Sequence, residues 1–480
     1  MKKISLLMSL VLLFISASCS DDDSSNNSGN VPQNLEVQNF IWKGLNTYYF
    51  WKDQVPNLAN DRFSSQDELN NFIANYQPDP LFESLLYQRN VTDKWSWIVD
   101  DYVALEKSFQ GVTKSNGMEF RLYRFKDSPS QVYGEVIYVI PNSDAKAKGI
   151  TRGDIFTKVN GTGITESNYR DLLFSSDSYT ISLANYNGGN PVENGTTKDL
   201  VKTELDENPV FINEVIEQSG KKIGYLMYNG FVSSYDKELN NAFGQLKAEG
   251  VTDLIIDLRY NGGGSVRTAT YLSSMVTGQF TGQVASKEKW NAEVQDYFVN
   301  NNPGTLENHF VSSMTDGTAI QSLQLDNLYV ITTNNTASAS ELLINSLLPY
   351  INVKTIGQTT SGKYVGSITI YDSTNFGREG ANPNHTWAMQ PIVLSIENKN
   401  GVNFPQGIAP TEQIGEQSGN LGVLGDENEP LLNAALGLIT GSSSATSRVF
   451  QSTDFNEEFD LSKTHAPNFG RMYIDYKTAR

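Results

Sequence analysis

Residues 221–260 read KKIGYLMYNGFVSSYDKELNNAFGQLKAEGVTDLIIDLRY, and this stretch decides the fold class. The apolar run at 222–228 predicts a strand. Apolar side chains then recur at the spacing of one helix face, at Leu239, Ala242, Phe243 and Leu246. A second apolar run, 254–258, predicts a buried strand. Strand, helix and strand in succession favour an α/β sheet, and this alternation continues from about residue 205 to 440.

The remaining sequence divides around this α/β region. Residues 35–105 have a helical pattern and predict a small N-terminal region, whose aromatic side chains we interpret as core. Residues 106–195 contain short strand-like runs separated by turns. A serine-rich break begins at Gly441, and the tail 441–480 has no pattern from which a structure is predicted. A chain of 480 residues is expected to form two or three folded units.

Composition excludes several classes of protein. The chain has 36 lysines and arginines against 54 aspartates and glutamates, a formal net charge of −18, which disfavours nucleic acid and anionic lipid surfaces as partners. Its one cysteine excludes an intrachain disulfide and a cysteine-cluster zinc site. We therefore expect no metal and no cofactor.

The cysteine has an informative position. Residues 1–18 contain two lysines, a short apolar run and three small residues, which is the pattern of a secretory signal peptide. Cys19 follows at once and resembles the lipobox of bacterial lipoproteins, which implies lipidation of its thiol. Residues 19–34 have the composition of a flexible tether. We expect a cell-envelope lipoprotein in the outer membrane, periplasmic or surface-exposed; the alternative is an ordinary signal peptide with an incidental cysteine.

A run in the middle of the chain resembles bacterial PDZ domains. It comprises a helix-like segment at 143–150, then RGDI at 152–155 and KVNG at 158–161. The resemblance implies a small β domain that binds an extended peptide by adding it to a sheet edge. By position, the loop for a terminal carboxylate is formed by Gly117, Met118, Glu119 and Phe120. The alternative is a turn between strands that binds no ligand.

Three loops of the α/β region carry residues suited to chemistry. Residues 257–264 read DLRYNGGG, so a strand leads into a glycine-rich turn that presents backbone N–H groups to an anion. Residues 336–341 read TASASE and put Ser338 at a helix N-terminus, where a capping box is the purely structural alternative. Residues 357–363 read GQTTSGK, a near match to a P-loop, but Tyr364 stands where serine or threonine would hold magnesium. We expect no nucleotide.

The second and third loops together supply a candidate nucleophile and base. A serine needs a base to become a nucleophile, and a lysine made neutral by burial can serve. Lys363 lies 25 residues after Ser338. This arrangement resembles the C-terminal processing peptidases, or tail-specific proteases, which are Ser-Lys hydrolases with a PDZ domain. The resemblance covers residues 40–440 and implies a peptidase domain at 205–440 with mixed sheet, helices and crotonase-like ββα units.

The same resemblance implies roles for single residues. Ser338 would be the nucleophile and Lys363 the general base. The backbone N–H groups of Gly263 and Ala339 would form the oxyanion hole. Ser367 stands where family members often have a glutamine that orients the lysine, and so is a candidate for that task.

These residues predict a serine endopeptidase that hydrolyses peptide bonds of protein substrates through an acyl-enzyme, with the PDZ-like domain binding substrate C-termini. Two alternatives remain. One is a catalytically weak or inactive peptide-binding surface lipoprotein of the same fold. The other is a Ser-His hydrolase that uses His385.

Overall fold

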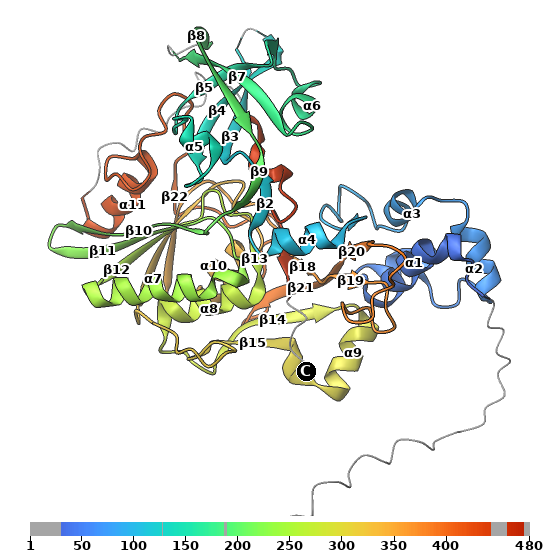
Figure 1. The fold of residues 1–480 in the computed structure, drawn as a ribbon. Helices are drawn as coiled ribbons and strands as arrows, with labels where there is room; N and C mark the ends of the chain where they lie inside the picture. The colour runs from blue at the N-terminus through green and yellow to red at the C-terminus, as the bar shows by residue number, and fades with distance from the viewer. Residues whose placement is uncertain (1–29, 127, 187–189, 443–457, 475–480) are drawn as a thin grey trace, which may run out of the picture.

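A computed structural model describes residues 30–126, 128–186, 190–442 and 458–474. The expected signal peptide, Cys19 and most of the tether therefore lie outside the described residues. Figure 1 shows three parts: a helical N-terminal part, a middle domain built mainly of strands, and a larger α/β core. Within the described ranges, no helix is long and apolar enough to cross a membrane.

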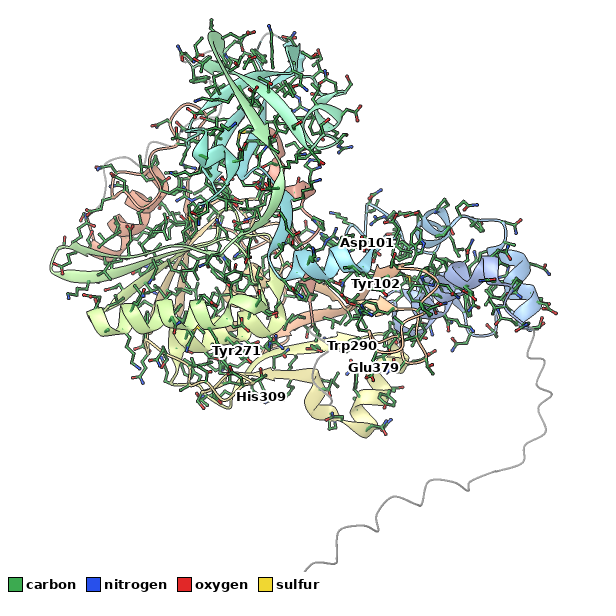
Figure 2. All side chains as sticks on the ribbon, in the orientation of Figure 1. Asp101, Tyr102, Tyr271, Trp290, His309 and Glu379 are labelled. Atoms are coloured by element: carbon green, nitrogen blue, oxygen red, sulfur yellow. The ribbon has the colours of Figure 1, made fainter. Side chains whose placement is uncertain are left out.

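The N-terminal part is held together by buried aromatic and aliphatic side chains. Its helices are α1 (Glu36–Tyr48), α2 (Gln66–Ile73), α3 (Pro78–Ser84) and α4 (Tyr102–Phe109). Phe40, Leu45 and Tyr49 are fully buried, which confirms the interpretation of the aromatic residues here as core. Asp101 caps α4 by accepting from the N–H groups of Val103 and Ala104, and this helix lies where the three parts meet (Figure 2).

A small sheet ties the N-terminal part to the core. Strand β1 (Trp97–Val99) pairs antiparallel with β20 (Ala388–Gln390), and β20 pairs with β19 (Ile370–Tyr371). The loop before β1 is fixed by Asp93, whose buried carboxylate accepts hydrogen bonds from the Tyr49 hydroxyl and from two backbone N–H groups. The N-terminal part therefore presents this loop to the core as a fixed element.

The middle domain, residues 112–206, contains a large antiparallel sheet, a separate two-stranded sheet of β2 and β9, and two short helices. Its elements are β2 (Val112–Ser115), β3 (Met118–Phe125), β4 (Ser128–Val139), α5 (Asp144–Ala147), β5 (Ile155–Val159), β6 (Thr162–Gly163), α6 (Tyr169–Leu173), β7 (Ser178–Asn185), β8 (Val192–Val201) and β9 (Thr203–Asp206). The main strand order is β23-β3-β4-β5-β7-β8, where β23 comes from the C-terminal tail. The strands extend past residue 195, the boundary expected from sequence.

The first sheet of the core confirms the α/β prediction. Its elements are β10 (Val210–Gln218), β11 (Lys221–Tyr228), α7 (Asp236–Glu249), β12 (Asp253–Asp257), β16 (Asn327–Thr332), α10 (Ala339–Leu347), β17 (Asn352–Gly357), β22 (Glu412–Gln413) and α11 (Pro430–Thr440). The strand order is β10-β11-β12-β16-β17-β22, and all neighbours from β11 onward run parallel. Leu254 and Ile256 face the layer of α7, whereas Ile255 faces α11 (Figure 1).

The core contains a second sheet. Its order is β13-β24-β18-β21-β14-β15. Its elements and the helices beside them are β13 (Gly264–Ser265), α8 (Val266–Thr277), β14 (Val284–Trp290), α9 (Ala292–Asn301), β15 (Glu307–His309), β18 (Val365–Ser367), β21 (Ile392–Asn398) and β24 (Met472–Tyr473). Residues 365–371 contain two short strands, β18 and β19, which join different sheets.

The C-terminal tail, for which the sequence predicted no structure, enters two sheets. Its described part contains β23 (Glu458–Leu461), the 3-10 helix η6 (Ser462–His465) and β24. Strand β23 belongs to the middle domain, whereas β24 belongs to the core. In Figure 1 the segment is the red ribbon that runs from the middle domain to β13 and β18.

Candidate active site

Parallel strands bring the three candidate loops together. Strands β12, β16 and β17 are neighbours and run in the same direction, so the loops that follow them meet at one edge of the sheet. The loops are tied to each other by hydrogen bonds. Thr336 Oγ1 donates to the Leu258 carbonyl at 2.8 Å, and the Ser361 N–H donates to the Thr336 carbonyl at 3.0 Å. Three loops that are far apart in the sequence thus form one cluster in space.

Ser338 lies in this cluster in an unusual conformation. It precedes α10 with φ +68° and ψ −118°, a region that residues with a Cβ rarely adopt. The side chain is completely buried, and its Oγ has no hydrogen-bond partner among the described residues. A strained backbone that holds an unpartnered hydroxyl in a buried cluster is typical of a functional residue. The Glu341 side chain still accepts from the Ser338 N–H, as it does in a capping box, so the cap and the strained serine occur together.

Glu341 joins the serine loop to the lysine loop. Its carboxylate is buried and accepts four hydrogen bonds, from the Ser338 N–H (2.8 Å), the Thr360 Oγ1 (2.6 Å), the Gly362 N–H (2.7 Å) and the Lys363 N–H (2.8 Å). The bonds from Ser338 and Lys363 reach the same oxygen, Oε2. The sequence offered Glu341 only as part of a helix-capping box. The structure gives it a second task, since it also holds the backbone of the candidate base.

Lys363 is buried beside the C-terminal tail. Its side chain is 1% exposed, and its Nζ donates to the Gly470 carbonyl at 2.6 Å. Nζ also lies 5.9 Å from the ring centre of Trp95. Burial, and next the nearby Arg471 guanidinium, hold the pKa of Lys363 well below its usual value of 10.5. A lysine with a lowered pKa is available as a neutral amine, which is the form a general base needs.

The glycine-rich turn packs directly against the serine. Gly263 has φ +109°, and a methyl group at its Cα would come 2.5 Å from the Ser338 Cβ, so only glycine fits here. Its N–H donates to the Asn261 side chain at 2.8 Å and is thus engaged within its own turn. Ala339 follows the serine as the first residue of α10, where backbone N–H groups point out of the helix.

Two family models match this chain. The model for peptidase family S41 matches residues 222–410, and the model for the peptidase S41 N-terminal domain matches residues 36–97. The two matches together span more than half of the sequence. The chain belongs to peptidase family S41. It is accordingly a serine-type peptidase, and the cluster of loops just described lies within the matched peptidase region.

Relatives and a solved structure agree with this assignment. A carboxyl-terminal-processing protease of Picosynechococcus sp. is 24% identical over 349 residues, which are 71% of this chain and 74% of that protein. The carboxy-terminal processing protease CtpA of Bacillus subtilis is 25% identical over 48% of this chain, and the match spans 45% of that protein. The crystal structure of a Bacteroides fragilis protein assigned to the S41 proteases has a TM-score of 0.65 and 26% identity, and covers 84% of this chain and 97% of that one.

Ser367 does not reach the lysine in this S41 peptidase. Its Oγ lies 2.5 Å from the Gln390 Oε1 and 3.2 Å from the Met472 carbonyl, and no hydrogen bond joins it to Lys363 among the described residues. The group that holds the Lys363 amine here is instead the Gly470 carbonyl. The expectation that Ser367 orients the base therefore finds no contact to support it.

The four residues expected to form a carboxylate loop lie at the start of β3. The N–H groups of Gly117 and Met118 donate to the side chains of Ser115 and Asn116. The Phe120 N–H donates to Ser462 Oγ at 2.8 Å, and this hydroxyl in turn donates to Glu119 at 2.6 Å. Burial raises the pKa of Glu119 to about 7. In the structure the loop therefore binds the hydroxyl of Ser462, an internal residue of the C-terminal tail, and not a terminal carboxylate.

The three histidines are engaged away from the serine. Both ring nitrogens of His385 have partners, since Nε2 lies 3.0 Å from Asp372 and Nδ1 accepts from the Trp387 N–H at 3.2 Å. His309 ends β15 at the outer edge of the second sheet (Figure 2). His465 pairs with Asp460 at 2.8 Å. Within the described ranges, no three His, Cys, Asp or Glu side chains form a group suited to a metal ion.

Three residues of the site were missed in the sequence. Trp95 lies beside Lys363, Asp93 fixes the loop that carries Trp95, and Arg471 reaches the same place from the tail. The Arg471 Nη1 donates to the Trp95 carbonyl at 2.8 Å. These residues come from the two ends of the chain, outside the peptidase region that carried the motifs. Without the fold, no local pattern connects them to Ser338.

Proposed function

We propose that this S41 peptidase is an endopeptidase in which Ser338 is the nucleophile and Lys363 the general base. The observation that carries the proposal is the shared carboxylate oxygen of Glu341, which binds the backbone N–H groups of both residues. The buried, unpartnered Ser338 hydroxyl and the lowered pKa of Lys363 supply the two chemical requirements. No described histidine is bonded to Ser338, which leaves lysine as the base.

The reaction follows from these groups. Neutral Lys363 takes the Ser338 proton as Oγ attacks the carbonyl carbon of a peptide bond, and the oxyanion is stabilised by backbone donors. Ala339 at the start of α10 supplies one N–H. Gly263 supplies the second after exchanging its present bond with Asn261. Lys363 then protonates the leaving amine, and water hydrolyses the ester. For this cycle the Lys363 amine must leave the Gly470 carbonyl and bond to Ser338.

Two substitutions test the assignment. Ser338→Ala and Lys363→Ala should each abolish hydrolysis of an unfolded protein such as casein while the circular-dichroism spectrum is unchanged. A fluorophosphonate probe should label the parent and not Ser338→Ala. Lys354→Ala, on the strand that leads into the lysine loop, is the matched control and should keep activity. A parent that neither cleaves casein nor reacts with the probe would favour the inactive peptide-binding lipoprotein.

For the middle domain we propose a PDZ-like peptide site between β3 and α6 that takes substrate C-termini. Support comes from β23, which lies on β3 and packs Phe459 against Tyr169 of α6. Because the pKa of Glu119 is near 7, its carboxyl is increasingly charged above neutral pH and would repel a terminal carboxylate. Peptide acids should bind better than their amides at pH 6, and this preference should shrink at pH 8. Equal binding of acid and amide at both pH values would remove the C-terminal part of the proposal.

We also propose that Cys19 is lipidated and anchors the protein in the outer membrane. The small residues before Cys19 and the tether after it support this. The mature parent should partition into the detergent phase of a Triton X-114 separation. Cys19→Ala should move it to the aqueous phase or stall its processing. A Cys19→Ala protein that partitions like the parent contradicts the anchor.

A further inference from the structure

The C-terminal segment, residues 458–474, runs from the middle domain to the cluster of loops that contains Ser338 and Lys363. Its first strand, β23, adds antiparallel to the edge strand β3 of the middle domain. Its last strand, β24, lies between β13 and β18 and pairs with both in parallel. β13 directly follows the glycine-rich turn, and β18 begins two residues after Lys363. A backbone between these two strands has the end of the glycine-rich turn on one side and the segment that follows Lys363 on the other.

The backbone just before β24 contacts the reactive groups. The Gly470 carbonyl accepts from Lys363 Nζ at 2.6 Å. A Cβ on Gly263 would meet the Ser338 Cβ at 2.5 Å and the Arg471 carbonyl oxygen at 2.7 Å, so this carbonyl lies beside both the serine and the turn. The next residue, Met472, pairs with Gly264. Of the tail's carbonyl groups, that of Arg471 therefore has the position expected of the bond to be attacked.

The Arg471 side chain packs against Trp95 and Trp97 of the N-terminal part, and this contact site is called the Trp95–Trp97 pocket below. Its guanidinium carbon lies 4.2 Å from the ring centre of Trp97, a cation–π distance. Its Nη1 donates to the Trp95 carbonyl at 2.8 Å, and its Nε donates to the Pro467 carbonyl at 3.2 Å. An aromatic face and a backbone carbonyl suit a flat cation. A carboxylate or a short apolar side chain would leave both groups unused.

We propose that the C-terminal segment is a substrate of the enzyme that carries it, cleaved between Arg471 and Met472, and that the Trp95–Trp97 pocket selects arginine before the cleaved bond. The inference rests on the proposed peptidase activity. In the step, Ser338 Oγ bonds to the Arg471 carbonyl carbon and the bond to the Met472 nitrogen breaks. The serine proton passes through Lys363 to that nitrogen. Water then hydrolyses the ester, leaving a carboxylate on Arg471 and an amine on Met472.

This assignment also explains the state of the base. While Gly470 holds the Lys363 amine, no hydrogen bond joins Lys363 to Ser338 in the described chain. The intact segment both occupies the site and diverts the base, so cleavage is slow and intact enzyme acts weakly on other proteins. Once the bond is cut, the residues after Arg471 leave, and Gly470 and Arg471, now at a free C-terminus, withdraw from the base, so that the enzyme is fully active. Casein hydrolysis should therefore show a lag, and the lag should shorten as the residues after Arg471 are lost.

Intact-mass spectrometry of the purified full chain over time provides the test. The parent should lose every residue after Arg471, and Ser338→Ala should stay intact at the same concentration. Arg471→Ala should slow the cleavage at least tenfold, and Arg471→Lys should slow it less because a cation remains. Arg378→Ala is the matched control: Arg378 also stacks on an aromatic ring, 4.4 Å from the ring centre of Tyr102, but it pairs with Glu106 and does not belong to the tail. It should be cleaved like the parent.

The outcomes separate this inference from the proposed function. If the parent cleaves casein but keeps its C-terminus, or is cut at another bond, the inference is wrong and the peptidase proposal stands. If the parent cleaves neither casein nor its own C-terminal segment, the peptidase proposal fails and the inference fails with it. Cleavage of Ser338→Ala by added parent, with arginine peptides cut faster than matched glutamate peptides, would support both the segment and the pocket. Equal rates for the two peptides would overturn the pocket.

Discussion

The two ends of the C-terminal segment are bound in different ways. In the middle domain, β23 is an edge strand, and its loss would leave every other strand pairing of that sheet in place. In the core, β24 lies between β13 and β18, and in the order of that sheet it alone connects them. An edge strand can be lost without disturbing the rest of its sheet, whereas a strand between the segment after the glycine-rich turn and the segment after Lys363 is held beside the proposed reactive groups. We infer that the β23 end of the segment binds the middle domain, whereas the β24 end places the bond that is cleaved.

The largest expected effect lies at the core end. Lys363→Arg should reduce the rate of casein hydrolysis about 10³-fold, as much as Lys363→Ala, because a guanidinium does not give up its proton. The same exchange at the middle-domain end, Lys463→Arg, should change the rate little. Lys463 donates to the Tyr138 hydroxyl and the Asn229 carbonyl, contacts that a second cation can replace. Steady-state kinetics on both variants checks this, and an active Lys363→Arg enzyme would end the Ser-Lys mechanism.

A smaller effect is expected at the carboxylate that joins the two reactive loops. Glu341→Gln replaces one acceptor oxygen by an amide that faces buried donors, so at least one of four hydrogen bonds is lost. We expect a loss of about 2 kcal/mol in the free energy of unfolding, with lower activity. Urea denaturation measures it. Glu238→Gln on α7 is the control and should change little. An unchanged free energy of unfolding in Glu341→Gln would mean that the Glu341 carboxylate does not hold the two loops together.

The pH dependence of the rate tests whether Arg471 acts on Lys363. Because the pKa of Lys363 is lowered, activity should fall about tenfold per pH unit as pH drops below that pKa and the amine is protonated. Arg471 contributes to the lowering by charge repulsion. The Arg471→Ala enzyme lacks this repulsion, so the pKa of Lys363 should rise and the pH–rate profile should shift to higher pH. A profile that does not move would remove Arg471 from the surroundings of the base.

The sequence predicted the peptidase core well because its signals are local. Strand, helix and strand patterns predicted an α/β sheet, and in the structure the parallel strands β12, β16 and β17 bring their following loops together. The closeness of Ser338 to the glycine turn of 257–264 was implied only by the resemblance to C-terminal processing peptidases, and the structure does bring the two together. The structure adds that the Gly263 N–H is engaged by Asn261, a contact two residues away that the glycine pattern does not reveal.

The tail could not be predicted for the opposite reason. β24 has two residues, too few for any periodicity, and its partners β13 and β18 lie more than a hundred residues earlier in the chain. The Trp95–Trp97 pocket similarly depends on β1 pairing with β20. For Ser367, position in a motif suggested a contact with Lys363, but the hydroxyl faces Gln390 and the tail. Short strands and distant pairings carry no local signal.

The smallest expected effect lies at the edge strand of the middle domain. Phe459→Ala removes a ring that packs against Tyr169, with 5.3 Å between ring centres, and that Arg124 covers at 4.9 Å. A single cross-strand side chain of this kind contributes up to about 1 kcal/mol, so cleavage of the segment should slow by at most about fivefold. Val192→Ala, on the exposed outer strand β8 at the opposite edge of the same sheet, should have no effect. The mass-spectrometric time course measures both. If Phe459→Ala slows cleavage as strongly as Arg471→Ala, the middle domain does more than add affinity, because then the reacting geometry at β24 depends on how β23 is seated.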